Sequence, residues 1–157
     1  MSHDWICSKE WKTPSDTGDA RQFLDEMLKD LGENGWGEEH TFGIHLAVEE
    51  ALMNAIKHGN QRNPEKYVTV EFRFNAKILQ IVIEDEGDGF NPSDVPDPTL
   101  EENLELPSGR GLMLMKTFMT TVEYNAKGNR VFMEKDLDAP PPDDDDDDYD
   151  DNDNEYM

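Results

Sequence analysis

The chain has 157 residues, 35% of them hydrophobic, and a formal net charge of −23, which suits one domain with a real core rather than two large ones. So acidic a chain argues against DNA, RNA or an anionic membrane as a partner, because those surfaces need Lys and Arg to neutralise their phosphates. Without an apolar run long enough to span a membrane or a secretory signal pattern, and with Cys7 as the only cysteine, we expect a cytoplasmic protein.

The first part of the chain predicts a strand and two helices. Asp4–Trp11 is short and β-prone, which predicts an edge strand. Ser15 or Asp16 is the expected cap of a first helix that runs to about Leu31. Several glycines then separate it from a second helix, which begins near Glu38 or Glu39.

The second helix carries a chemically unusual border. At about 100° per residue its apolar side chains share one broad face: Ile44, Ala47, Val48, Ala51, Leu52 and Ala55. Glu50, Asn54 and His58 are each four residues apart and run in a line along the edge of that face. The simpler alternative is a polar stripe on an ordinary amphipathic helix, with His58 packing or capping at the helix end.

Two alternating segments follow. Lys66–Asn75 predicts a strand with one apolar face, and Lys77–Asp85, richer in β-branched residues, predicts a central strand. The short turn between them indicates an antiparallel hairpin. Residues 91–108 hold four prolines and many acids, which is typical of a functional lid or a disordered loop.

The last part of the core predicts one helix and two strands. Gly109–Gly111 (GRG) opens an apolar helix over Leu112–Met119, and strands follow at Thr121–Ala126 and Arg130–Lys135. We therefore place one domain at 1–138 and a tail at 139–157, whose residues 143–157 include nine Asp and one Glu. The tail is expected to be solvated and disordered; alternatively, it competes for a basic patch on a partner.

Two glycine motifs suggest a ligand site. After the predicted central strand the chain reads Asp85-Glu86-Gly87-Asp88-Gly89, where glycines let backbone approach a flat ligand and the first carboxylate can accept from an amino group. Gly109–Gly111 at a helix start offers backbone N–H groups to phosphate. Each motif alone also fits an ordinary turn or loop end.

The order of the motifs is more specific than any one of them. A helix with ExxxNAxxHG, a strand ending in DxGxG, a long loop and GRG opening a helix together resemble the GHKL ATP-binding superfamily, over about residues 5–135. The match is closest to its anti-sigma regulatory factor, or serine-protein kinase, branch. The resemblance implies an α+β two-layer sandwich, with helices on one face of a mixed, mainly antiparallel sheet.

The resemblance also implies roles. Glu50 would be the general base toward an incoming hydroxyl, Asn54 would coordinate Mg²⁺, and Arg110 would offset charge in the transition state. Asp85 would bind the adenine amino group of ATP. The nucleotide-binding set implied in this way is Asn54, His58, Asp85, Gly87, Gly89, Gly109, Arg110 and Gly111.

The activity implied is transfer of the ATP γ-phosphate to a Ser or Thr of an anti-anti-sigma (STAS-type) protein, with a sigma factor as a possible second partner and a homodimer as a family expectation. The alternative is a non-catalytic ATP-gated protein-binding switch, and slow ATP hydrolysis without a protein substrate is a third reading. Retention of Glu50 favours catalysis.

Overall fold

The computed structural model describes residues 4–87 and 109–139, apart from the side chains of Gly109 and Arg110. In chain order the elements are β1 (Cys7–Pro14), α1 (Thr17–Glu33), α2 (Glu38–Met53), the π-helix η1 (Asn54–Gly59), β2 (Tyr67–Phe74), β3 (Ile78–Glu84), α3 (Gly109–Phe118), β4 (Thr121–Tyr124) and β5 (Arg130–Asp136). Gly89, the predicted lid at 91–108 and the acidic tail beyond Ala139 lie outside the described residues. Within the described ranges, no helix combines the length and apolarity needed to cross a membrane.

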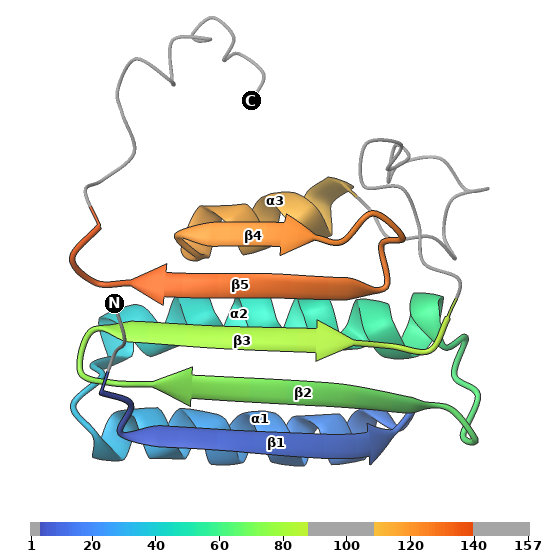
Figure 1. Ribbon diagram of the computed structural model, residues 1–157, viewed down its shortest axis with the longest axis horizontal. Helices are drawn as coiled ribbons and strands as arrows, with labels where there is room; N and C mark the ends of the chain where they lie inside the picture. The colour runs from blue at the N-terminus through green and yellow to red at the C-terminus, as the bar shows by residue number, and fades with distance from the viewer. Residues whose placement is uncertain (1–3, 88–108, 140–157) are drawn as a thin grey trace, which may run out of the picture.

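The five described strands form one sheet in the order β1-β2-β3-β5-β4 (Figure 1). Strand β3 is central and β1 lies at an edge, as predicted, and β2 and β3 form the predicted antiparallel hairpin. The sheet was expected to be mixed and mainly antiparallel; every described pairing is antiparallel. The reason is that β4, which follows α3, does not pair with β3. The chain then turns back, and β5 lies between β3 and β4 and is antiparallel to both.

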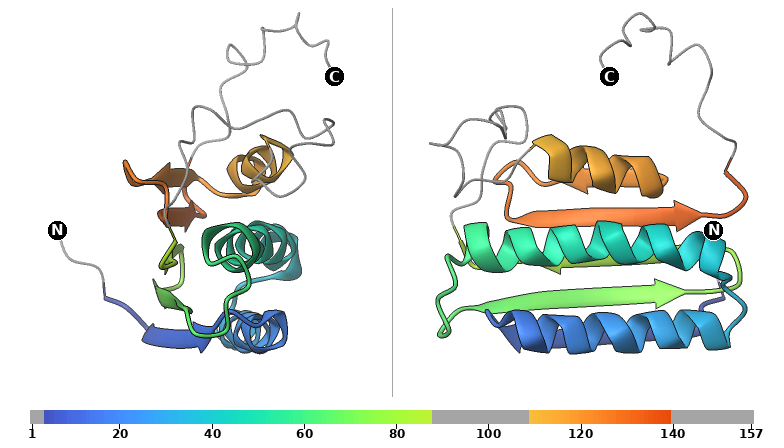
Figure 2. Two further views of the ribbon diagram at one scale, coloured as in Figure 1. Left: turned by 90° about the vertical axis from the view of Figure 1, so that its right-hand side faces the viewer. Right: turned by 180° about the vertical axis from the view of Figure 1, so that it is seen from behind.

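All helices lie on one face of this sheet, so the predicted two-layer α+β sandwich is confirmed (Figure 2). The alternation of β2 places Val68, Val70, Phe72 and Phe74 in the core between the layers. The ring of Phe23 on α1 lies 5.7 Å from that of Phe72 and 5.6 Å from that of Trp11 on β1. Burial of these apolar side chains is the main force that holds the helices on the sheet.

Helix α1 begins and ends through identifiable contacts. The side chain of Asp16 accepts from the N–H groups of Gly18 (2.7 Å) and Asp19 (3.1 Å), which confirms the predicted cap. Beyond its C-terminus, Trp36 Nε1 donates to the carbonyl of Asn75 at 2.9 Å. This bond ties the α1–α2 connection to the β2–β3 turn.

Helix α3 packs closely beside α2. A Cβ built on Gly43 of α2 would overlap the ring of Phe118 at the end of α3, and Phe118 in turn packs edge-on against Phe42. The contact between α2 and α3 at Gly43 therefore leaves no room for a side chain there. Gly32 in α1, in contrast, has open space around its Cα hydrogen.

We predict opposite effects for these two helical glycines. Gly43→Val should destabilise the fold by about 1–3 kcal/mol, because the Phe118 ring would have to move out of its packed position. Gly32→Ala should stabilise it by about 0.5–1 kcal/mol through helix propensity alone. Urea unfolding followed by circular dichroism measures both; equal effects of the two substitutions would contradict the packing argument.

Candidate functional site

The end of the second helix meets the end of the central strand at a contact between backbones. A Cβ on Gly59, the last residue of η1, would overlap the carboxyl group of Asp85, which directly follows β3. A Cβ on Gly87 would overlap the carbonyl oxygen of Gly59. The two glycines thus form a cradle around Asp85 that any other residue would fill.

Asp85 is an acid placed where ionisation is difficult. Its side chain is buried (8% exposed), and burial raises its pKa to about 6, although the hydrogen bond from Gly87 N to Oδ1 (2.8 Å) works in the opposite direction. The charge of Glu84 adds to the rise, while Lys127 and Lys66 reduce it. A buried carboxylate at the edge of a cradle is an acceptor suited to a flat, amino-bearing ligand.

Glu50 and Asn54 lie one helical turn apart beside this cradle. The N–H of Asn54 donates to the carbonyls of Glu50 and Ala51, so these two side chains keep the α-helical stacking that the sequence predicted. Asn54 is 7% exposed, and its Nδ2 has no hydrogen-bond partner in the part of the chain that the structure describes. An unsatisfied buried amide is costly, and a ligand can satisfy it.

Glu50 faces the start of α3. A Cβ on Gly111 would lie 2.6 Å from Glu50 Oε2, so only glycine leaves room for the carboxylate there. Glu49 points elsewhere: its oxygens lie 3.6 Å from Arg21 Nε and 3.6 Å from His45 Nε2. The adjacent acids are therefore chemically different, and only Glu50 borders the site.

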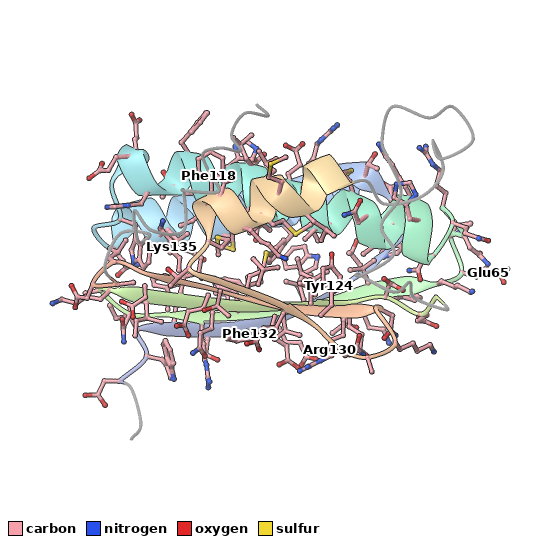
Figure 3. The ribbon with its side chains drawn as sticks, turned by 90° about the horizontal axis from the view of Figure 1, so that it is seen from above. Glu65, Phe118, Tyr124, Arg130, Phe132 and Lys135 are labelled. Atoms are coloured by element: carbon pink, nitrogen blue, oxygen red, sulfur yellow. The ribbon has the colours of Figure 1, made fainter. Side chains whose placement is uncertain are left out.

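The sequence analysis missed Tyr124 on β4. It lies opposite Val131 on the inward side of the sheet, and Figure 3 shows it between the sheet and the helices. Burial raises the pKa of its hydroxyl to about 12; the Asn54 side chain opposes this rise, and the charges of Asp85 and Glu50 add to it. The hydroxyl thus stays protonated at physiological pH. The inward register of β4 was the only signal that could have indicated it.

The predicted line of Glu50, Asn54 and His58 is only partly correct. The α-helix ends at Met53, and Asn54–Gly59 forms a π-helix, whose hydrogen bonds reach five residues back. The wider turn changes the angle between Asn54 and His58 about the helix axis from that of α-helical spacing. His58 is half-buried and has an interaction partner.

The GRG motif lies inside a helix rather than before one. Helix α3 begins at Gly109, three residues earlier than the predicted start at Leu112. The backbone of Gly109–Gly111 therefore forms the first turn, where N–H groups have no intrahelical acceptor and the helix dipole favours anions. The predicted contact between the motif and phosphate stays a prediction.

The described residues fit ATP at the cradle. A buried carboxylate, two glycines without room for a side chain, an unpartnered amide and a helix N-terminus lie on neighbouring elements. In a nucleotide site, a carboxylate can bind the amino group of the base, glycines let the ligand lie close to the backbone, and a helix N-terminus favours the phosphates. Asn54 offers an amide oxygen of the kind that Mg²⁺ accepts alongside phosphate oxygens and water.

Comparison with known proteins defines the class. The family model described as a histidine kinase-like ATPase domain matches residues 11–135, and the chain belongs to this family. The ATP-binding superfamily indicated by the motifs is thereby confirmed.

Among its relatives are several anti-sigma F factors. That of Clostridium perfringens (strain SM101 / Type A) is 33% identical over 105 residues, which cover 64% of this chain and 75% of that protein. That of Bacillus cytotoxicus is 38% identical over 102 residues, covering 64% and 63%. That of Clostridium kluyveri (strain NBRC 12016) is 35% identical over 98 residues, covering 59% and 68%. The chain is thus most simply described as similar to anti-sigma F factors, the branch that the sequence predicted.

We predict that Asp85→Asn stabilises the nucleotide-free protein. The native pKa of about 6 exceeds the usual aspartate value of 3.8, so folding favours the neutral acid, and stability falls as pH rises from about 4 to 6. At pH 8 the Asn variant should be more stable by about 1–2 kcal/mol, and near pH 4 the difference should vanish. Urea unfolding at both pH values measures it; a difference that does not change with pH would contradict the cause.

Proposed function

We propose that this protein is an ATP-dependent serine/threonine kinase of the anti-sigma regulatory type that phosphorylates a Ser or Thr of an anti-anti-sigma (STAS-type) protein. The observation that carries the proposal is the position of Glu50 and Asn54, one turn apart, between the Asp85 cradle and the first turn of α3. Two further findings support it: the chain belongs to the histidine kinase-like ATPase family, and its relatives include anti-sigma F factors.

In this proposal Asp85 orients the base. Its carboxylate accepts from the exocyclic amino group of adenine, while Gly59 and Gly87 allow the close approach of the two backbones that holds this carboxylate in place. Asn54 presents its amide oxygen to the cation, and the first turn of α3 lies toward the terminal phosphates, where the helix dipole favours anions. Bound MgATP supplies the transferable phosphoryl group and much of the charge neutralisation.

Glu50 is the proposed general base. Its carboxylate borders Gly111 of α3, so a hydroxyl that reaches the terminal phosphate over that first turn comes within range of Oε2. The carboxylate would then accept the hydroxyl proton as the oxygen bonds to the γ-phosphorus and the bond from that phosphorus to the ADP leaving group breaks. Arg110 is proposed to offset transition-state charge, and His58 and Gly89 remain members of the proposed nucleotide-binding set.

The partners follow from the class and the charge. We infer an anti-anti-sigma protein as the substrate and a sigma factor as a second partner, with a second copy of this chain as a further one. The strongly acidic chain favours basic surfaces on them. We place the protein in the cytoplasm, and its single cysteine agrees with that compartment.

We predict that Glu50→Gln separates binding from catalysis. Phosphorylation of the purified partner with labelled ATP should fall by about 10²–10⁴-fold, because the amide cannot accept the hydroxyl proton. ATP affinity should stay within a factor of about two, since the shape of the side chain is kept. Glu49→Gln is the matched control and should transfer phosphate normally, because Glu49 faces Arg21 and His45. Undiminished transfer by Glu50→Gln would contradict the proposed role of Glu50, whereas no transfer by the native protein would favour the non-catalytic switch.

We predict that Asn54→Ala removes the magnesium dependence of ATP binding. Calorimetry of the native protein should show tighter binding with Mg²⁺ than without it, and the variant should lose about ten- to hundredfold of that gain. Asn54→Ala also removes the contact between the Asn54 side chain and the Tyr124 hydroxyl, so circular dichroism first checks that the variant is folded. Asn63→Ala, at an exposed turn, is the control. An unchanged magnesium effect in Asn54→Ala would refute the ligand role.

A further inference from the structure

One peptide group next to the cradle is held at both of its polar ends. The carbonyl oxygen of Asp85 accepts from Asn129 Nδ2 at 3.0 Å, and the N–H of Glu86 donates to Asn60 Oδ1 at 2.8 Å. These two groups belong to the same planar peptide unit. Side chains from two distant parts of the chain therefore prevent that plane from rotating.

The first of these asparagines is itself fixed. Asn60 follows η1 and is 1% exposed. Its Nδ2 donates to Ser15 Oγ at 2.9 Å and to the carbonyl of Tyr67 at 3.0 Å, and Ser15 Oγ donates to the carbonyl of Lys66 at 2.8 Å. Two neighbouring segments, at Ser15 and at Lys66 and Tyr67, thus determine where Oδ1 points.

The second asparagine is oriented by its own turn. Asn129 lies between β4 and β5, and its Oδ1 accepts from Asn125 Nδ2 at 2.9 Å, which directs its Nδ2 toward Asp85. Its carbonyl also accepts the N–H of Asp85 at 2.9 Å. The backbone of Asp85 is therefore bonded on both sides of its Cα.

These bonds act on the Asp85 side chain through the backbone. With the peptide plane fixed, Gly87 N reaches Asp85 Oδ1 at 2.8 Å and fixes the rotation of the carboxyl group. A carboxylate aimed in advance loses less conformational entropy when it accepts a hydrogen bond. This gain in affinity applies only to ligands that have a hydrogen-bond donor facing the Asp85 carboxylate.

We propose that Asn60 and Asn129 clamp the Asp85–Glu86 peptide and thereby set the preference for a purine that carries an exocyclic amino group. Both are positioning residues, because they act through Asp85 and not on the ligand. The inference rests on the proposed role of Asp85 in binding adenine. A purely structural role would instead affect all nucleotides alike.

The binding test compares ATP with purine riboside triphosphate, which lacks only the amino group. Asn129→Ala should reduce the preference for ATP by about three- to tenfold, as expected for one weakened hydrogen bond, and leave the affinity for purine riboside triphosphate unchanged. The control is Asn63→Ala, an asparagine at an exposed turn whose side chain accepts from the N–H of Glu65 rather than bonding to Asp85 or Asn129. Ser15→Ala, which loosens Asn60 from its far side, should reduce the preference to a smaller extent.

A second measurement needs no nucleotide. Hydrogen exchange of the Glu86 amide in the free protein should accelerate by about tenfold in Asn129→Ala, and should remain native in Asn63→Ala. Equal weakening of both nucleotides by Asn129→Ala, or a native Glu86 exchange rate in that variant, would overturn the clamp. If the native protein binds both nucleotides equally while exchange still responds as expected, the role of Asp85 in base recognition fails and the clamp itself stands.

Discussion

The site depends on a contact between two stretches of backbone that tolerates no side chain. Gly59 closes η1 and Gly87 follows β3, and a Cβ on Gly87 would overlap the carbonyl oxygen of Gly59. The contact joins the helix that carries Glu50 and Asn54 to the strand that ends at Asp85. Because backbone cannot yield as a flexible side chain can, the relative position of helix and strand is set here with little freedom.

The close approach of these two backbones also affects the ionisation of Asp85. Water is largely excluded from Asp85, so its carboxylate is less stable than in the unfolded chain, and the fold loses stability in holding it ionised at neutral pH. Asn54 adds a second unfavourable feature, since its buried Nδ2 is unpartnered within the described ranges. Two neighbouring polar groups that destabilise the unliganded fold are typical of a binding site, because a ligand can supply the hydrogen bonds that these groups lack in the free protein.

The helix layer shows how local and tertiary forces combine at the site. The apolar spacing of α2 is helical, and the side chains predicted to face the core, from Ile44 to Ala55, are all buried. The chain nevertheless widens into a π-helix at Asn54, and π-turns are found frequently at functional sites. Periodicity reports an average pitch, so this local change could not be read from the spacing of Glu50, Asn54 and His58.

The sequence by itself determined the elements, the two-layer class, the family and the positions that border the site, because apolar periodicity and glycine motifs are local signals. Only the tertiary structure decided which of these positions touch. It placed Tyr124 toward Asn54, set β5 between β3 and β4, and brought Asn60 and Asn129 to one peptide group. The reason is that an asparagine in a turn has the same local pattern whether its amide meets water or a peptide far along the chain, and only packing brings the two together.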